Sequence, residues 1–289
     1  MTFATDAALD AAPEAAPGAA PDIAYAKLNL ALHVRSRGED GYHVLETLFA
    51  FCTDGDRLTL EDEPGLRLEG PFAAALSGEG DNLVTRAARE WAALFGGAQA
   101  GFRLEKNLPI ASGIGGGSAD AAAALRLLAA RDGIDPADPR VHAIAAGLGA
   151  DVPACVLSRA ARGEGRGEQL VPVSLGRLTG QPVLLVNPGI ALSTGAVFKA
   201  WDRIDRGALP QGVDAALEGR NDLEAPAVSL VPEIGDVLDL LGAQPGLLFA
   251  RMSGSGATCF ALFEDEAARD AAAAALPACW WRLATRLRP

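Results

Sequence analysis

The stretch Leu108–Asp120 reads LPIASGIGGGSAD and leads directly into an alanine-rich run, Ala121–Arg131. Glycine has no Cβ, so the main chain of such a loop can approach a ligand closely and adopt positive φ. Where a loop of this kind enters a helix, its free N–H groups and the helix dipole attract an anion. The stretch therefore predicts a phosphate-binding loop and a following helix, with Ser118 as the N-cap and Asp120 in the first turn.

Phosphate-binding loops differ in spacing, and the spacing separates the alternatives. A Walker A loop requires Gly-Lys followed by Ser or Thr, and the chain contains no Gly-Lys pair. Dinucleotide and protein-kinase loops require G-x-G-x-x-G, but counting from Gly113 or Gly115 places Ser118 or Asp120 at the third glycine. The pattern that remains is P-x-x-x-G-x-G-G-G-S, starting at Pro109. A flexible glycine linker is the competing interpretation, which the capped helix after the loop disfavours.

The composition is that of a globular protein. The chain has 289 residues, 49% of them hydrophobic, and a mean hydropathy of +0.16, enough for one large or two modest domains. No apolar run approaches the ~20 residues of a membrane span. Residues 1–20 are rich in Ala and Pro and lack Lys and Arg, which indicates a disordered tail rather than a targeting peptide. The net charge of −12 argues against a nucleic-acid partner, but not against a nucleotide.

The cysteine, histidine and lysine residues add three expectations. Four cysteines occur without a C-x-x-C pair, so we expect buried, reduced thiols in a cytoplasmic protein: Cys52, Cys155, Cys259 and Cys279. The three histidines lack metal-ligand spacing, so no protein-held metal site is predicted. Of the 25 Lys and Arg residues only three are lysines, and Arg is a poor substitute where a compact ammonium is needed: Lys27, Lys106 and Lys199.

Periodicity and turn signals predict interleaved strands and helices. Strands are expected at Ile23–Arg35, Tyr42–Cys52, Asp56–Glu61, Gly101–Glu105, Val183–Asn187, Leu247–Met252, Thr258–Glu264 and Trp280–Leu287, with a turn at Asp54-Gly55. Helices are expected at Asn82–Phe95, Ser118–Arg131, Pro136–Gly147, Thr194–Ile204, Leu230–Leu241 and Asp265–Leu276. We expect an α+β protein with two lobes, residues 21–168 and 169–289, divided near the glycine-rich turn Gly163–Gly167.

Two segments carry residues suited to acid–base chemistry, and each has a purely structural alternative. In Ala26–Leu30, alternation places Lys27 and Asn29 on one face of a strand, either in a site or at a solvent-facing edge. Asp151 directly follows a helix, so it is either a helix cap or a functional carboxylate. A carboxylate beside a lysine can deprotonate an alcohol, while the lysine keeps it ionised and stabilises charge on a transferred group.

Two further segments suggest ligand contacts. The sequence Asp40-Gly41-Tyr42-His43 is either an ordinary hairpin corner or a turn that presents an aromatic ring and an imidazole. The second glycine-rich connection, Ser253–Ala257, is either a tight hairpin or a backbone wall of a phosphate or substrate pocket.

Together these segments resemble the GHMP kinase superfamily and, within it, the 4-diphosphocytidyl-2-C-methyl-D-erythritol kinases of the non-mevalonate isoprenoid route. The resemblance spans residues 23 to about 265, and its motifs follow the family's order: A-K-L-N-L at Ala26–Leu30, D-G-Y-H at Asp40–His43, the glycine loop at Pro109–Ser118, G-A-D-V-P at Gly149–Pro153, a G-x-G-E-like element at Gly163–Glu168 and S-G-S-G-A at Ser253–Ala257. It implies a two-lobed GHMP kinase fold. The first lobe would be like ribosomal-protein-S5 domain 2, the second would be ferredoxin-like, and the site would lie between them.

The resemblance also implies roles for individual residues. Asp151 would be the base that activates the 2-hydroxyl of 4-diphosphocytidyl-2-C-methyl-D-erythritol, Lys27 its electrostatic partner and Asn29 a substrate contact. The cytidyl substrate would further contact Tyr42, His43, Thr194 and Phe198. Mg²⁺ and ATP would be the cofactors, and ATP would contact Asn82 and the loop residues Pro109, Ile110, Ala111, Ser112, Gly113, Ile114, Gly115, Gly116, Gly117, Ser118 and Ala119.

The chain departs from the family pattern at the end of the loop, and two other functions compete. Ala119 stands where a second serine is common, which removes a hydroxyl contact but keeps the backbone N–H. No metal-binding glutamate is evident, so Mg²⁺ is expected to be carried mainly by the ATP phosphates. The alternatives are a GHMP kinase for another small alcohol, which the D-G-Y-H element disfavours, and a non-catalytic nucleotide sensor, which would need no base. We expect a small-molecule substrate and no membrane partner; the oligomeric state is left open.

Overall fold

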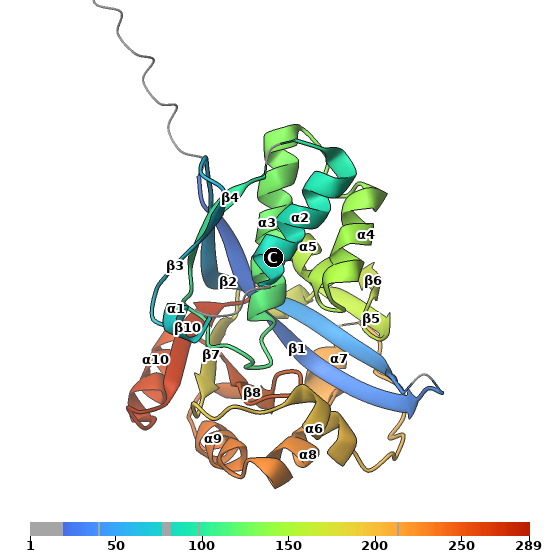
Figure 1. Ribbon diagram of the computed structural model, residues 1–289. Helices are drawn as coiled ribbons and strands as arrows, with labels where there is room; N and C mark the ends of the chain where they lie inside the picture. The colour runs from blue at the N-terminus through green and yellow to red at the C-terminus, as the bar shows by residue number, and fades with distance from the viewer. Residues whose placement is uncertain (1–19, 40, 77–81, 98, 213) are drawn as a thin grey trace, which may run out of the picture.

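The computed structural model describes residues 20–39, 41–76, 82–97, 99–212 and 214–289. The tail expected at residues 1–20 lies outside the described residues except for Ala20, and Asp40 of the D-G-Y-H motif also lies outside them. The described chain forms two β-sheets, and helices cover the outer face of each (Figure 1). The α+β, two-lobed architecture predicted from the sequence is confirmed.

The larger sheet belongs to the first part of the chain and has the strand order β3-β4-β2-β5-β6, with β1 paired to β2. The strands are β1 (Asp22–Arg37), β2 (His43–Glu61), β3 (Gly65–Glu69), β4 (Gly101–Glu105), β5 (Ala161–Gly165) and β6 (Gln169–Pro172). Helices of the same part of the chain lie over one face: α1 (Ala73–Leu76), α2 (Leu83–Phe95), α3 (Gly116–Asp132), α4 (Pro139–Leu148) and α5 (Val152–Leu157). Helix α3 is the central one, since it contacts β1, β2 and the other helices α2, α4 and α5.

The smaller sheet has the order β10-β7-β9-β8 and is antiparallel throughout. Its strands are β7 (Pro182–Asn187), β8 (Leu247–Met252), β9 (Cys259–Phe263) and β10 (Trp281–Arg286). The second lobe also contains the 3₁₀ turn Gly176–Leu178 and the helices α6 (Thr194–Ala200), α7 (Asp214–Glu218), α8 (Glu224–Leu230), α9 (Glu233–Gly242) and α10 (Glu266–Ala275). Helices α9 and α10 pack on this sheet.

Strand β2 packs against both neighbouring layers, because its side chains alternate between its two faces. Phe49 and Phe51 of β2 pack in a core with helices α2 to α5. The intervening Leu48 and Ala50 pack in a second core with Phe260 of β9 and with β7. Because successive strand residues point to opposite faces, β2 is buried on both sides and the two sheets lie against each other.

The turn predicted at Asp54-Gly55 is wrong, because β2 runs unbroken through it. Gly55 pairs with Tyr25 beside a register shift. A Cβ at Gly55 would lie 2.0 Å from the carbonyl oxygen of Ala24. The glycine therefore permits a close approach of two strands at an irregularity in their pairing, a role that glycine also has inside strands.

The helix after the glycine loop begins earlier than predicted. Helix α3 starts at Gly116, and its N-cap is Gly115, whose φ of 66° is left-handed. The assignment of Ser118 as the N-cap is therefore wrong; it lies inside the first turn. The helix ends at Asp132, one residue after the predicted end at Arg131, and is followed by Gly133, which is also left-handed with φ 66°. The apolar run at residues 152–157 forms the helix α5.

Other differences concern helix ends, the lobe boundary and one cysteine. The helix predicted at Leu230–Leu241 is α9, which begins at Glu233, directly after Pro232, and the preceding α8 was not predicted. The turn near Gly163–Gly167 joins β5 to β6 within the first sheet, and the chain enters the second sheet at β7; the division at residues 168 and 169 stays a prediction.

Three cysteines are buried free thiols, but Cys279 is exposed in the turn before β10, which corrects the expectation that all four are buried. None of the helices in the described ranges has the length and apolarity to cross a membrane.

The close approach at Gly55 yields a stability prediction. Gly55→Ala is expected to lower the free energy of unfolding by roughly 1–3 kcal/mol, the usual cost of overpacking, because the new Cβ meets backbone rather than a movable side chain. Chemical denaturation monitored by circular dichroism measures it. Gly147→Ala in α4 is the matched control, since a Cβ there meets nothing within 4 Å; it should stabilise by up to about 1 kcal/mol. Equal stability of the two variants would contradict the assigned role of Gly55.

Candidate active site

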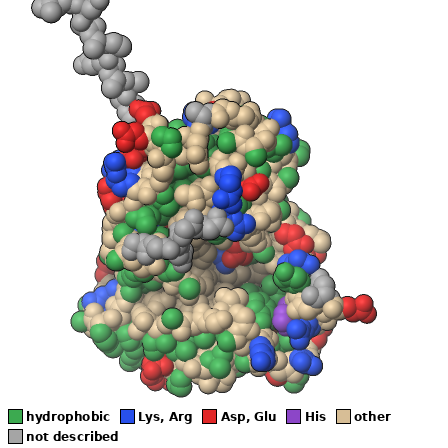
Figure 2. Space-filling view, viewed as in Figure 1, with side chains coloured by type: hydrophobic (Ala, Val, Ile, Leu, Met, Phe, Trp, Pro, Cys, Tyr) green, Lys and Arg blue, Asp and Glu red, His purple; other side chains and the backbone are tan. Residues whose placement is uncertain are grey.

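A cavity of about 1280 Å³ lies between the glycine-rich loop, β1 and the loops of the second lobe. It exceeds the roughly 300–1,000 Å³ usual for a site that holds one small ligand, so it has room for two. Figure 2 shows the molecule hollowed between its upper and lower parts, with basic side chains and a histidine gathered at one side of the hollow.

The glycine-rich loop packs against Lys27 on one side and against the Ser253–Ala257 backbone on the other, and these leave no space for side chains. The backbone N–H of Lys27 donates to the carbonyl oxygen of Ile114 at 2.9 Å. A Cβ on Gly115 would lie 3.0 Å from Cε of Lys27, and one on Gly113 would lie 2.4 Å from the carbonyl oxygen of Ser253. Both glycines also have positive φ, so these two positions require glycine on two independent grounds.

The loop residues predicted to bind ATP divide into two groups. Those that line the cavity are Ala111, Ser112, Gly113, Gly115, Gly116, Gly117 and Ser118. Pro109, Ile114 and Ala119 are buried, and Ile110 packs against the core under α2 to α5. Ala119 belongs to that core, where a serine hydroxyl would need a partner. The departure from the family's second serine therefore falls on a residue that faces away from the cavity.

Asn82 is the N-cap of α2, and its Oδ1 accepts a hydrogen bond from the backbone N–H of Val84 at 2.8 Å. The neighbouring Leu83, rather than Asn82, lines the cavity. The adenine contact assigned to Asn82 by resemblance stays a prediction, and its side chain already has a structural role.

Lys27 and Asp151 form an ion pair in the cavity, although they are far apart in the sequence. The Lys27 ammonium lies 3.0 Å from Oδ2 of Asp151 and 2.7 Å from Oδ1 of Asn29. The Lys27 side chain is 3% exposed and that of Asp151 is 37% exposed, so the carboxylate reaches the cavity while the ammonium stays behind it. Asp151 precedes α5 but makes no capping hydrogen bond, and Lys27 and Asn29 are buried rather than at a solvent-facing edge.

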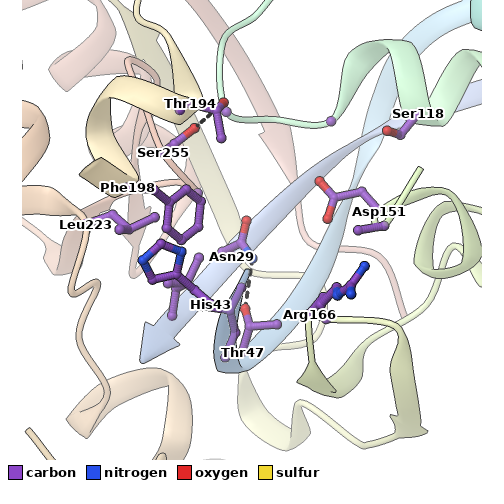
Figure 3. A pocket seen from close by; sticks show the side chains of 18 of the residues that line it. Asn29, His43, Thr47, Ser118, Asp151, Arg166, Thr194, Phe198, Leu223 and Ser255 are labelled. Atoms are coloured by element: carbon purple, nitrogen blue, oxygen red, sulfur yellow. Dashed lines mark hydrogen bonds between the residues drawn. The ribbon is translucent and has the colours of Figure 1, made fainter. Parts of the chain in front are cut away.

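Asn29 is fixed in turn by the neighbouring strand. Its Nδ2 donates to Oγ1 of Thr47 at 2.8 Å, and the Thr47 hydroxyl donates to the carbonyl oxygen of Ala31 (Figure 3). This chain fixes the orientation of the Asn29 amide, so that its oxygen faces the Lys27 ammonium.

Aromatic rings gather at the other end of the cavity. The ring centroid of His43 lies 4.7 Å from that of Phe198, tilted by 31°, and 5.6 Å from that of Trp201 (Figure 3). Tyr42 is 57% exposed, and the guanidinium carbon of Arg166 lies 3.7 Å from its ring centroid. The structure thus brings three predicted residues to one cavity. Tyr42 lies in the loop before β2, His43 is the first residue of β2, and Phe198 lies on α6.

The environment of His43 favours its neutral form. Burial lowers the pKa of His43 below its ordinary value of 6.5, and the nearby charges of Arg37 and Arg203 lower this pKa further. Both arginines line the cavity, together with Arg166 and Lys199. A chain with a net charge of −12 therefore concentrates basic side chains at this site.

The Ser253–Ala257 connection is both a hairpin and a wall of the cavity. It joins β8 to β9, and Gly254 and Ser255 line the cavity. The Ser253 hydroxyl donates to the carbonyl oxygen of Gly113 at 3.0 Å and accepts from the backbone N–H of Asn29 at 3.2 Å. Ser255 Oγ lies 2.8 Å from Oγ1 of Thr194 (Figure 3).

Sequence reasoning missed the residues that hold this connection. Nδ2 of Asn221 donates to the carbonyl oxygens of Met252 and Gly254, each at 2.8 Å. Asp222 accepts from the backbone N–H of Val34 at 2.8 Å. The available signal was the adjacent Asn-Asp pair just before α8, since both residue types favour helix starts and turns. Arg166 and Trp201 carried no comparable signal.

Acidic side chains are few in the cavity. Among the residues that the structure describes, Asp151 and Glu168 line it. Within the described ranges, no group of three His, Cys, Asp or Glu side chains is arranged to hold a metal ion.

Comparison with known proteins agrees with this architecture. Residues 82–159 match the GHMP kinases N terminal domain, and residues 203–281 match the GHMP kinases C terminal domain. The chain is 60% identical to the 4-diphosphocytidyl-2-C-methyl-D-erythritol kinase of Rhizorhabdus wittichii, over 92% of this chain and 94% of that protein. It is 55% identical to the enzyme of the same name from Novosphingobium aromaticivorans, over 92% of each.

Solved structures agree with the sequence relatives. A crystal structure of 4-(cytidine 5'-diphospho)-2C-methyl-D-erythritol kinase superposes with a TM-score of 0.79 at 38% identity, covering 93% of this chain and all of that one. An L. major mevalonate kinase reaches a TM-score of 0.62 at 18% identity over 94% of this chain and 96% of that one, and shares the fold alone.

The chain belongs to the GHMP kinase superfamily, a class of small-molecule kinases. Within that class it is a member of the 4-diphosphocytidyl-2-C-methyl-D-erythritol kinase family.

The charges around His43 yield a prediction for its titration. NMR titration should place the pKa of His43 below 6.5, and Arg37→Gln should raise it because a neighbouring positive charge is removed. A folded-state pKa below the unfolded one means that this group stabilises the fold above pH ~6.5 and that the contribution is lost as the pH falls through the folded pKa. Arg177→Gln, at an exposed residue of the second lobe, is the control. An unchanged titration in Arg37→Gln would contradict the contribution of the Arg37 charge to the pKa of His43.

Proposed function

We propose that this protein transfers the γ-phosphoryl group of ATP to the 2-hydroxyl of 4-diphosphocytidyl-2-C-methyl-D-erythritol, in the non-mevalonate route to isoprenoid precursors. The observation that carries the proposal is the Lys27–Asp151 ion pair at 3.0 Å, set between a glycine cradle and an aromatic pocket in one cavity. The names of the most similar relatives, at 50–60% identity, support the choice of acceptor.

The donor end is suited to phosphate. Backbone N–H groups of the glycine-rich loop and the N-terminus of α3 provide a cradle for anions. The Ser118 hydroxyl and the Asp151 carboxylate both line this part of the cavity (Figure 3), and oxygen donors of this kind fit Mg²⁺ that keeps waters and phosphate ligands. When bound, Mg²⁺ would neutralise phosphate charge; the ATP phosphates would carry most of its ligands, and the residue of this chain that would hold it is Ser118.

The chemical step follows from the ion pair. The acceptor hydroxyl oxygen forms the new bond to the γ-phosphorus while the bond to the ADP oxygen breaks, and Asp151 receives the hydroxyl proton. The buried Lys27 ammonium pairs with the Asp151 carboxylate and faces the negative charge of the transferring group. Asn29 orients that ammonium through its 2.7 Å hydrogen bond. Most of the rate enhancement comes from positioning and electrostatics.

The acceptor end is suited to a cytidyl group. Tyr42 and Phe198 offer ring faces for stacking, and a neutral His43 offers one donor and one acceptor for the edge of a base. Thr194 lines the same end. The basic residues Arg37, Lys199 and Arg203 also line the cavity and match the negative diphosphate of such a substrate. The buried free thiols accord with a cytoplasmic location.

A coupled assay of ADP release tests the proposal directly. Purified protein with Mg²⁺ and ATP should release ADP rapidly with 4-diphosphocytidyl-2-C-methyl-D-erythritol, and only at background rate with mevalonate, with homoserine or with no acceptor. Rapid turnover of one of the other alcohols would favour a different GHMP kinase. Nucleotide binding with no acceptor-dependent release would favour a sensor.

Substitution of the proposed base gives the sharpest mechanistic prediction. Asp151→Asn keeps the shape of the side chain but removes its ability to take a proton, so kcat should fall at least ~100-fold, the scale of general-base loss. ATP affinity should change little, because the loop contacts remain. Steady-state kinetics and nucleotide titration measure both. Turnover near the wild-type rate would exclude Asp151 as the base.

The aromatic pocket should affect one substrate selectively. Tyr42→Ala is expected to raise KM for the cytidyl substrate by about tenfold, since stacking on a base contributes roughly 1–3 kcal/mol, and to leave KM for ATP unchanged. Phe198→Ala should behave in the same way. Equal increases in both KM values would remove Tyr42 from the cytidyl pocket.

A further inference from the structure

The turn between β5 and β6 brings to the acceptor end of the cavity an arginine that the proposed chemical step does not use. Arg166 is exposed in this turn and lines the cavity. Its guanidinium carbon lies 3.7 Å from the ring centroid of Tyr42, well inside the ~6 Å limit of a cation–π contact. The guanidinium therefore covers one face of the ring that is proposed to stack on the cytosine base.

The pairing of β5 with β2 places Arg166 beside Tyr42. In this antiparallel pair, Leu45 lies opposite Gly165. One further step of the same register brings Arg166 opposite Val44, and Tyr42 lies two residues before Val44. Arg166 and Tyr42 are therefore diagonal neighbours on one face of the sheet, a spacing that long and aromatic side chains can span. The contact follows from the register of the two strands.

The turn that carries Arg166 is stabilised by its own hydrogen bonds. Oε2 of Glu168 accepts the backbone N–H of Arg166 at 2.6 Å, and the backbone N–H of Gly167 donates to the carbonyl oxygen of Glu164 at 3.0 Å. Gly165 and Gly167 have φ values of 75° and 104°, which favour glycine. Arg166 thus extends from a fixed backbone, which lowers the entropy cost of holding its long side chain on the ring.

Tyr42 carries a ring whose orientation has to be fixed when it stacks on a base. It directly precedes β2 and is 57% exposed, and an exposed side chain loses rotamer freedom when a ligand orders it. Its backbone is held by the turn, since its carbonyl oxygen accepts the N–H of Gly38 at 2.7 Å. Stacking of Arg166 orders the ring before a ligand binds, so less of the entropy cost remains for the binding step.

We propose that Arg166 is a positioning residue for the acceptor: its guanidinium supports one face of the Tyr42 ring, and the opposite face stacks on the base. This inference rests on the cytidyl acceptor proposed above. Arg166 acts through the ring of Tyr42 and takes no part in the transfer of the phosphoryl group. It therefore sets the affinity for the acceptor and leaves the Lys27–Asp151 ion pair and the glycine-rich loop unaffected.

Substitution of Arg166 tests this role by its selectivity. Arg166→Met removes the planar cation, and should raise KM for the cytidyl substrate at least about threefold, the scale of a lost cation–π contact. The kcat and the KM for ATP should each change less than about twofold, because the ion pair and the loop are unaltered. Arg166→Lys should restore only part of the affinity, since an ammonium does not stack as a plane. An unchanged KM for the acceptor would overturn the proposal, and so would a lowered one, which would place Arg166 where the base binds.

A matched control removes the same kind of contact from the other of the chain's two tyrosines. The guanidinium carbon of Arg288 lies 3.6 Å from the ring centroid of Tyr25, and neither residue is among the described residues that line the cavity. Arg288→Met should therefore leave both KM values unchanged. An equal rise of the acceptor KM in Arg288→Met and Arg166→Met would indicate a general loss of packing and would contradict the role of Arg166.

A double-mutant cycle shows whether Arg166 acts through Tyr42. In a Tyr42→Ala background, Arg166→Met should raise the acceptor KM less than about 1.5-fold, because the ring that it supports is already absent. Independent effects, in which the two increases multiply, would overturn the proposal and would indicate that Arg166 contacts the substrate itself, for example at its diphosphate.

A measurement without substrate separates this inference from the proposed function. In protein with ring-labelled tyrosine, the NMR signals of Tyr42 should shift in Arg166→Met while those of Tyr25 stay in place, and Arg288→Met should give the reverse. Unchanged Tyr42 signals in Arg166→Met would overturn the stacking and with it the proposal. If the signals shift as expected but the wild type turns over no cytidyl substrate, the proposed function is refuted and the positioning of the Tyr42 ring by Arg166 stands.

Discussion

The glycine-rich loop can occupy its place only because its glycines leave room for the close approach of two other segments of the chain. Gly115 lies against Lys27 of β1, and Gly113 lies against Ser253. The Ser253 hydroxyl joins the three segments, since it donates to Gly113 and accepts from the backbone of Asn29. The first lobe supplies the loop and β1, and the second supplies Ser253, so the cradle exists only while the two sheets remain packed together.

The close packing at the glycine-rich loop also places the lysine side chains of this region. Gly115 has the Lys27 side chain against it, and Gly116 has the Lys106 ammonium behind it. Two of the chain's three lysines therefore flank the start of α3 from opposite sides. Each is neutralised differently: Lys27 by an Asp151 carboxylate that reaches the cavity, and Lys106 by two carboxylates that do not. The exposed carboxylate suits proton transfer, and the two enclosed carboxylates suit support of the backbone.

Sequence reasoning recovered what local patterns determine. The loop, the strand that carries Lys27 and Asn29, and the end of α3 to within one residue were all predictable from spacing and residue type. The failures came from tertiary contacts. A serine near a helix start is normally a cap, but here a left-handed Gly115 begins α3. An Asp-Gly pair normally indicates a turn. Gly55 instead lies inside a strand, where the nearby carbonyl oxygen of Ala24 on the paired strand leaves no room for a Cβ. The sequence showed that lysines are few. It did not show the contacts of Lys106, because Asp56 and Asp120 are distant from it in the sequence.

The position of the second lobe also depends on β1. The backbone of Leu32 donates to the carbonyl oxygen of Arg220 and accepts from Asp222, and Asn221 between them holds Met252 and Gly254. The segment that precedes α8 thus pairs with the strand that carries Lys27. Homoserine and mevalonate kinases share this fold at 18% identity, so the fold alone does not select the acceptor. In the proposed function, selection comes from side chains such as Phe198 on α6, which the pairing with β1 holds in register with the Lys27–Asp151 ion pair. A strand shared by both lobes allows the acceptor pocket to vary in sequence while its distance to the phosphate cradle stays fixed.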